Sequence, residues 1–223
     1  RPIAVPVDDE GMTVAGLQAA LDAGVRAVLL TPRAQNPTGA SLSAERAAAL
    51  RTLLADHPYV LVIEDDHFSM LSAQPFHSVI SASHRRWALI RSVSKFLGPD
   101  MCLAVVASDP DTAERLAERL NPGATWVSHL LQRVALEQLT DPDAVAAVAA
   151  ASAHYAARNR AAAAAFTAAG VPGVAGDGLS LWVSLPVPAR AASEQLMRRG
   201  WLVRPGDGVV LEGARAARHL RIT

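Results

Sequence analysis

The sequence predicts an α/β protein, with a mostly parallel β-sheet flanked by helices, followed by a smaller α+β domain. Two observations predict the sheet. Several apolar runs have the length of β-strands and contain few charged side chains, which is typical of strands covered on both faces of a sheet. Segments with helical spacing lie between some of them, as in helix-connected parallel strands. The strand-like runs are residues 25–30, 59–63, 87–90 and 103–107.

The first elements can be placed from local signals. Residues 1–8 are typical of a strand, and residues 13–22 place apolar side chains at helical spacing. Thr13 has the hydroxyl side chain favoured at a helix N-cap. A second helix is expected over residues 43–54, because His57-Pro58 then ends the helical pattern.

The middle of the chain is helical by the same criteria. We expect helices over residues 111–120 and 126–139, and a long Ala-rich helix over about 143–169. Polar and charged residues interrupt the Ala-rich region, so we expect no membrane span there. We also expect the tryptophans at 126, 182 and 201 to pack in hydrophobic cores.

A change of pattern after residues 170–173 indicates the smaller domain. Residues 179–185 alternate between apolar and polar, as a half-buried strand does, and a short helix over 191–199 ends at Gly200. Further strands are expected at 201–203 and 219–222. We therefore predict two domains, residues 1–155 and residues 156–223.

The composition restricts the class of function. The chain has 223 residues, of which 51% are hydrophobic, and its 21 basic and 21 acidic residues give a net charge of zero. This balance predicts that the segment itself contacts neither nucleic acid nor an anionic membrane. The single cysteine excludes an internal disulfide and fits a reducing, cytoplasmic compartment. We expect no secretory signal, because residues 1–8 are typical of a strand, and we expect the chain to be a fragment of a longer protein.

Three apolar runs are each followed by a polar residue that can take part in chemistry. Asn36 follows the first run, Asp65 the second and Lys95 the third. Ligands of open α/β sheets bind beyond the carboxyl ends of the strands. The sequence therefore predicts a ligand site that contains these three side chains.

The motifs around these residues resemble those of the fold-type I aminotransferases. The chain is most similar to the aminotransferase-like domain of MocR/GntR-type transcription regulators. The likeness covers essentially the whole chain, and several motifs recur in the same order. They are Thr31-Pro-Arg-Ala-Gln-Asn-Pro-Thr-Gly39, Val62-Ile-Glu-Asp-Asp66, Ser92-Val-Ser-Lys95 with Gly98-Pro-Asp100, and Leu220-Arg-Ile-Thr223. The resemblance implies an incomplete large domain of the transferase type that depends on pyridoxal 5'-phosphate (PLP), with a truncated small domain.

The resemblance assigns a role to each candidate residue. Lys95 is the Schiff-base lysine and catalytic base, and Asn36 donates a hydrogen bond to the 3-oxygen of the PLP ring. Asp65 keeps the pyridine nitrogen protonated, with Glu64 and Asp66 as competitors for this role. The remaining candidates are Ser92 and Ser94 for the phosphate, His67 near the ring oxygen, and Arg221 for the carboxylate of an amino-acid-like ligand. No metal ligands are expected.

Two positions depart from the family pattern. Related sequences have an arginine seven residues after the lysine, where it pairs with the phosphate, and here that residue is Cys102. A thiol does not form the charge-assisted, two-bond contact of a guanidinium. The family also favours tyrosine two residues after the aspartate, where this chain has His67.

Three functions are compatible with these residues. The first is the PLP-binding effector region of a MocR/GntR-type regulator, dimeric when complete, in which a DNA-binding domain ahead of this segment contacts DNA. The second is an aminotransferase that moves an amino group between an amino acid and a 2-oxo acid. The third is a degenerate, cofactor-free module for binding or dimerisation, for which Cys102 and His67 are the main indications.

Overall fold

The first helices begin where the sequence predicts them. The computed structural model describes residues 1–120, 126–209 and 218–223. Helix α1 (Val14–Asp22) is capped by Thr13, whose hydroxyl oxygen accepts a hydrogen bond from the Gly16 N–H at 3.3 Å. Helix α2 (Ala44–Ala55) is capped in the same way by Ser43. Both caps satisfy backbone N–H groups that have no partner within the helix.

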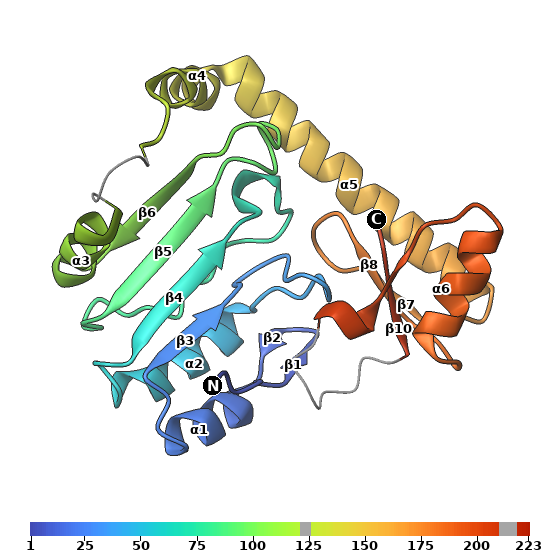
Figure 1. Cartoon of the computed structure of the whole chain (residues 1–223), viewed down its shortest axis with the longest axis horizontal. Coiled ribbons are helices and arrows are strands. Elements are labelled where there is room, and N and C mark those ends of the chain that lie inside the picture. The colour runs from blue at the N-terminus through green and yellow to red at the C-terminus, as the bar shows by residue number, and fades with distance from the viewer. Residues whose placement is uncertain (121–125, 210–217) are drawn as a thin grey trace.

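The main sheet has the strand order β3-β4-β5-β6, and its bounds are β3 (Ala27–Leu30), β4 (Leu61–Asp66), β5 (Trp87–Ser92) and β6 (Ala104–Ser108). The first three strands are parallel, and β6 is antiparallel to β5. The carboxyl ends of β3, β4 and β5 therefore lie along one edge of the sheet (Figure 1). This arrangement confirms the predicted mostly parallel sheet.

Helices α1 and α2 cover one face of this sheet. Leu17 of α1 and Leu50 and Leu54 of α2 pack against Val28 and Val62, and all five side chains are almost fully buried. The opposite face is covered only in part by the described residues. On the opposite face of β3, Leu29 keeps 67% of its surface exposed. The apolar character of the strands indicated only which side chains favour burial, and not whether another element lies against them.

Three helices follow the main sheet: α3 (Pro110–Leu120), α4 (His129–Thr140) and α5 (Pro142–Ala168). Asp141 caps α5, and its carboxylate accepts a hydrogen bond from the Asp143 N–H at 2.9 Å. Helix α5 runs from beside the loops of the main sheet to the second sheet (Figure 1). Position 155 falls within this uninterrupted helix, so the division of the chain there stays a prediction.

The second sheet forms the smaller α+β unit, in which all strand pairs are antiparallel. Its order is β7-β8-β10-β9, with β7 (Gly173–Val174), β8 (Leu181–Ser184), β9 (Arg204–Pro205) and β10 (His219–Ile222), accompanied by helix α6 (Ala189–Arg198). Ala163 of α5 packs against Leu181 and Val183 of β8, which joins the long helix to this sheet. Short 3-10 helices occur at η1 (Ser69–Leu71) and η2 (Gly206–Val209).

Some predicted elements differ from those observed. The N-terminal strand is reduced to β1 (Val7–Asp8), which pairs with β2 (Gly11–Met12) in a hairpin. The strand expected at residues 201–203 occurs instead at β9. Trp126 and Trp201 are not core residues of the described structure, since they are 79% and 68% exposed.

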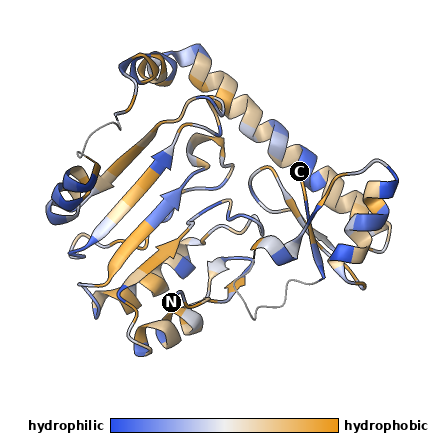
Figure 2. Ribbon diagram, viewed as in Figure 1, coloured by the Kyte–Doolittle hydropathy of each residue, from blue (hydrophilic) through white to orange (hydrophobic). Residues whose placement is uncertain are grey.

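Polarity varies along the strands in a way that marks one edge of the sheet. Figure 2 shows apolar residues along the main strands and hydrophilic residues toward the ends of β4 and β5. No described helix combines the length and the apolar character needed to cross a membrane. The polar strand ends face the loops in which the predicted site residues lie.

Candidate functional site

The loop that follows β3 is held in a tight turn by its own side chains. The side-chain oxygen of Gln35 (Oε1) accepts hydrogen bonds from the Thr38 N–H at 3.1 Å and from the Thr38 hydroxyl at 2.6 Å. The backbone N–H of Gly39 donates to the Gln35 carbonyl oxygen at 2.6 Å. These bonds leave Asn36 exposed at the turn, with its side chain free to face a neighbouring element.

Four of the predicted site residues line one cavity of about 150 Å³ beyond the strand ends: Asn36, His67, Lys95 and Arg221. They come from the loop after β3, the position directly after β4, the loop after β5 and strand β10. Segments that are far apart in the sequence therefore meet at this cavity. Its remaining wall includes residues 177–180 of the smaller unit.

Arg221 and Asn36 contact each other directly. One terminal nitrogen of the Arg221 guanidinium donates a hydrogen bond to the Asn36 Oδ1 atom at 3.0 Å. The Nε atom of Arg221 is buried and has no hydrogen-bond partner within the described residues. A buried guanidinium N–H without an acceptor is costly, and a carboxylate is the acceptor that best matches its planar geometry. The positively charged guanidinium, which lines the cavity, is suited to an anionic ligand.

Lys95 supplies a free amine at the same cavity. Its side chain is exposed and makes no hydrogen bond or ion pair with any described residue. His67, also on the cavity wall, packs its ring edge-on against Phe68 with 5.3 Å between the ring centroids. The cavity thus combines an amine, an imidazole and the Asn36–Arg221 pair, which is a donor set that fits PLP and an amino-acid-like ligand.

The three consecutive acidic residues of β4 lie in different environments. Glu64 and Asp66 have no exposed surface, and Asp65 is half-buried. Glu64 accepts hydrogen bonds from the Val79 N–H at 2.6 Å and the Ser78 hydroxyl at 2.8 Å, and burial raises the pKa of Glu64. Asp66 pairs with two arginines. Among the described residues, Asp65 alone of the three has no hydrogen-bond or ion-pair partner.

Asp65 and the two serines do not line the cavity that contains Lys95. Asp65 faces an adjacent cavity of about 730 Å³, which shares Gln35 and Pro37 with the first. The Ser92 hydroxyl donates to the Ser94 oxygen at 3.2 Å, and the Ser94 hydroxyl donates to the Met101 carbonyl at 3.0 Å. Both hydroxyl hydrogens are thus already used, so a phosphate would require these groups to rotate.

Cys102, the residue at the family's arginine position, has an exposed side chain. Its sulfur lies 3.8 Å from the carbonyl oxygen of Pro99 and contacts no other polar group of the described residues. Nothing in this contact replaces the positive charge that the family pattern has there. Within the described residues, no group of three histidine, cysteine, aspartate or glutamate side chains is arranged to hold a metal ion.

The sequence reasoning missed the residues that attach the smaller unit to the cavity. The Asp177 N–H donates to the carbonyl oxygen of Gly39 at 2.8 Å, and the Asp177 carboxylate accepts a hydrogen bond from the Ala73 N–H at 3.0 Å. Asn159 of α5 is buried and donates to the carbonyl oxygen of Gly178 at 2.8 Å. Two sequence features could have pointed to these residues: Asp177-Gly178 is a typical turn sequence, and Asn159 is a lone asparagine in an Ala-rich helix.

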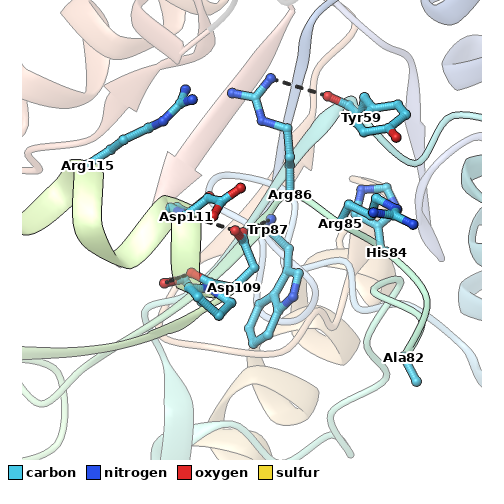
Figure 3. Close-up of a pocket in the computed structure, with 12 residues that line it drawn as sticks. Tyr59, Ala82, His84, Arg85, Arg86, Trp87, Asp109, Asp111 and Arg115 are labelled. Carbon is cyan, nitrogen blue, oxygen red and sulfur yellow. Dashed lines mark hydrogen bonds between the residues drawn. The ribbon is translucent and has the colours of Figure 1, made fainter.

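Another cavity, of about 610 Å³, contains none of the predicted site residues. It lies at the start of β5 and of helix α3, where Figure 3 shows Arg86 hydrogen-bonded to Tyr59 and Asp109 beside Trp87. Asp109 caps α3 through the Thr112 N–H at 3.0 Å and also accepts from the Trp87 N–H at 2.8 Å. Burial opposes the charged form of this carboxyl, but the hydrogen bonds from Thr112 and Trp87 lower the pKa of Asp109. These contacts serve the helix cap.

Comparisons with known proteins agree with this fold. The family model for aminotransferase class I and II matches residues 2–223. The vitamin B6 salvage pathway transcriptional repressor PtsJ of Salmonella typhimurium is 49% identical over 220 residues, which cover 98% of this chain and 50% of that protein. The chain therefore spans about half the length of this curated relative.

Solved structures show the same fold at low sequence identity. The aromatic aminotransferase from Pyrococcus horikoshii superposes with a TM-score of 0.89 at 20% identity, and the match covers all of this chain and 62% of that one. An archaeal alanine:glyoxylate aminotransferase gives a TM-score of 0.86 at 20% identity, covering 99% of this chain and 58% of that one. These structures establish the architecture.

Proposed function

Because this chain belongs to the class I and II aminotransferase family, we propose that it is the PLP-binding effector region of a MocR/GntR-type transcription regulator. The likeness to a transcriptional repressor of vitamin B6 salvage, at 49% identity over 98% of the chain, supports a regulator over an enzyme. The solved aminotransferases of similar fold are only 20% identical and do not distinguish these two functions.

The observation that carries the proposal is the cavity shared by Lys95, Asn36, His67 and Arg221. PLP supplies an aldehyde for an amine and a ring that withdraws electrons. Lys95 provides that amine, and it has no competing partner among the described residues. The Asn36 amide group remains available to donate to the ring oxygen, because only its Oδ1 atom is used by Arg221.

The other site residues bind and orient the ligand in this proposal. The Arg221 guanidinium, which lines the cavity, binds the carboxylate of an amino-acid-like molecule. Asp65 provides an unpaired carboxylate for a protonated ring nitrogen, and His67 provides a second donor near the ring oxygen. Ser92 and Ser94 bind the phosphate after their hydroxyl groups rotate away from their present acceptors.

The complete protein extends this role to gene regulation. We propose that a linked DNA-binding domain contacts DNA in the cytoplasm, that the complete protein is a homodimer, and that this segment reports the presence of PLP or its adduct with an amino compound. A regulator of this kind needs ligand binding and not turnover. Catalytic transamination is the alternative, and steady conversion of amino-acid and oxo-acid pairs by the complete protein would support it.

Absorbance spectroscopy tests the proposal. The complete protein with PLP should show the visible absorbance band of a lysine Schiff base, and Lys95→Ala should abolish it. Lys95→Arg is the matched control, because it keeps the positive charge and does not form the Schiff base, so it should lose the band as well. If the unmodified protein shows no band at saturating PLP, the cofactor-free binding module becomes the better description.

A further inference from the structure

The segments that carry the predicted site residues are tied together by one buried carboxylate. Asp66 is the last residue of β4 and has no exposed surface. Its Oδ1 atom accepts from Arg33 Nε at 2.8 Å, and its Oδ2 atom accepts from a terminal nitrogen of Arg33 at 2.9 Å and from Arg91 Nε at 3.0 Å. Arg33 lies in the loop after β3, and Arg91 lies near the end of β5.

The ring of Phe76 completes this group, which we call the Asp66 cluster (Arg33, Asp66, Phe76 and Arg91). Both guanidinium groups lie over the Phe76 ring, at 5.5 Å for Arg33 and 4.9 Å for Arg91. Arg33 also donates to the carbonyl oxygen of Gln74 at 3.0 Å. Two cations thus share one carboxylate, and the aromatic face and the backbone carbonyl provide additional negative potential.

Each member of the Asp66 cluster is close in sequence to a residue of the candidate site. Arg33 is three residues before Asn36, and Arg91 is four residues before Lys95. Asp66 follows Asp65 directly, and successive side chains of a strand point to opposite faces. Holding Asp66 on the helix-covered face therefore holds Asp65 on the opposite face. None of the three charged residues lines the cavity that contains Lys95.

We infer that Asp66 is a positioning residue that sets the placement of Asn36, Asp65 and Lys95 relative to one another. This inference rests on the proposed function, because it concerns the geometry of the PLP site. Asp66 acts through its two arginine partners and not by contact with a ligand. A purely structural carboxylate would stabilise the fold without changing the two loops that carry Asn36 and Lys95.

The substitution Asp66→Asn tests this role with little change in shape. The amide nitrogen of asparagine donates hydrogen bonds, so it faces the guanidinium groups without accepting from them. In the complete protein we expect PLP affinity, measured from the Schiff-base absorbance, to fall by about 10- to 100-fold, the range found when residues that orient metal-binding side chains are removed. The chemically matched control is Asp8→Asn, which breaks the two-bond Arg46–Asp8 pair and should leave PLP affinity unchanged, because neither residue lines the cavity that contains Lys95.

A second measurement needs no PLP. Hydrogen–deuterium exchange of the ligand-free protein should show faster exchange in residues 31–40 and 91–97 together in Asp66→Asn. Both segments contain hydrogen-bonded amides that can report such a change, because the Gly39 N–H donates to the Gln35 carbonyl oxygen and the Leu97 N–H donates to the Val93 carbonyl oxygen. Faster exchange spread over the whole chain, with no excess in these two segments, would identify a structural role only and would overturn the inference.

A charge-keeping variant covers the case in which Asp66→Asn does not fold. Arg33→Lys retains a cation beside Asp66 but lacks the planar fork that makes the two-bond contact. It should weaken PLP binding and loosen residues 31–40, and wild-type behaviour in both measurements would overturn the inference. If wild-type protein shows the Schiff-base band and Asp66→Asn binds PLP equally tightly, the inference fails while the proposed function stands. A wild-type protein without the band refutes the proposed function itself.

Discussion

The contact between Gly39 and Gly176 gives a prediction whose magnitude follows from the geometry. Gly39 has a φ angle of +71°, and a Cβ atom added to it would lie 2.7 Å from the Cα atom of Gly176 and 2.9 Å from the carbonyl oxygen of Asp177. Both clashing atoms belong to the backbone, so no side chain can rotate to relieve the contact. Gly39→Ala therefore combines an unfavourable backbone conformation with a direct clash.

The two costs can be estimated separately. A non-glycine residue in the left-handed region costs roughly 1–2 kcal/mol, and an added methyl group in a tightly packed position costs about 1–3 kcal/mol. We expect Gly39→Ala to lower the free energy of unfolding by about 2–5 kcal/mol in urea denaturation. It should also weaken PLP binding, because the clash displaces residues 177–180, which form part of the cavity wall.

Gly24→Ala is the matched control for this experiment. Gly24 has a similar φ angle of +79°, but nothing lies within 4 Å of its added Cβ atom. This variant should lower the free energy of unfolding only by the cost of the backbone conformation, roughly 1–2 kcal/mol, and should leave PLP affinity unchanged. If Gly39→Ala and Gly24→Ala destabilise the protein equally, the close approach of the two loops is refuted.

Two further predictions concern Cys102 and His219. Cys102→Arg restores the family's phosphate-binding cation and should tighten PLP binding by about tenfold or more, as expected for one hydrogen bond to a charged group. The affinity is measured by titrating the Schiff-base band. An unchanged affinity, or an equal gain in Cys102→Ser, would contradict the placement of Cys102 beside the phosphate. Burial lowers the pKa of His219, so the folded state binds its proton less readily than the unfolded state, and wild-type stability should fall as pH drops from about 7.5 to about 5. His219→Phe keeps an aromatic ring stacked on Trp182, whose ring centroid is 5.0 Å away. The difference in melting temperature between this variant and the wild type should increase in favour of the variant as the pH is lowered. A difference that stays constant with pH would refute the lowered pKa of His219.

Local features of the fold could be predicted from the sequence because short-range chemistry determines them. Thr13 and Ser43 cap the first two helices as expected for hydroxyl side chains ahead of helical segments. The strand-like apolar runs also form the expected sheet. Burial could not be predicted in the same way, as Leu29 and Trp126 show, because apolar character does not reveal which elements lie nearby.

The candidate site could be predicted in part, since motif residues at strand ends meet at one edge of a parallel sheet. Asn36, His67, Lys95 and Arg221 do line one cavity. The hydrogen bonds of Ser92 and Ser94, and the approach of Gly39 to Gly176, depend on backbone geometry that no local pattern reports. The same holds for the pairing of Arg33 and Arg91 with Asp66, which joins residues from three separate strand ends.

The acidic sequence Glu64-Asp65-Asp66 shows how the fold distinguishes residues that the sequence could not. Strand alternation puts Glu64 and Asp66 on the face covered by helices, where each carboxylate finds its hydrogen-bond partners. Asp65 points to the other face and has no partner among the described residues. A buried acid with satisfied hydrogen bonds is not available to a ligand, whereas a half-buried acid without a partner can pair with a cation that enters the adjacent cavity. A protonated pyridine nitrogen is such a cation, and we propose Asp65 over its neighbours for this role because its carboxylate is the one of the three without a partner among the described residues.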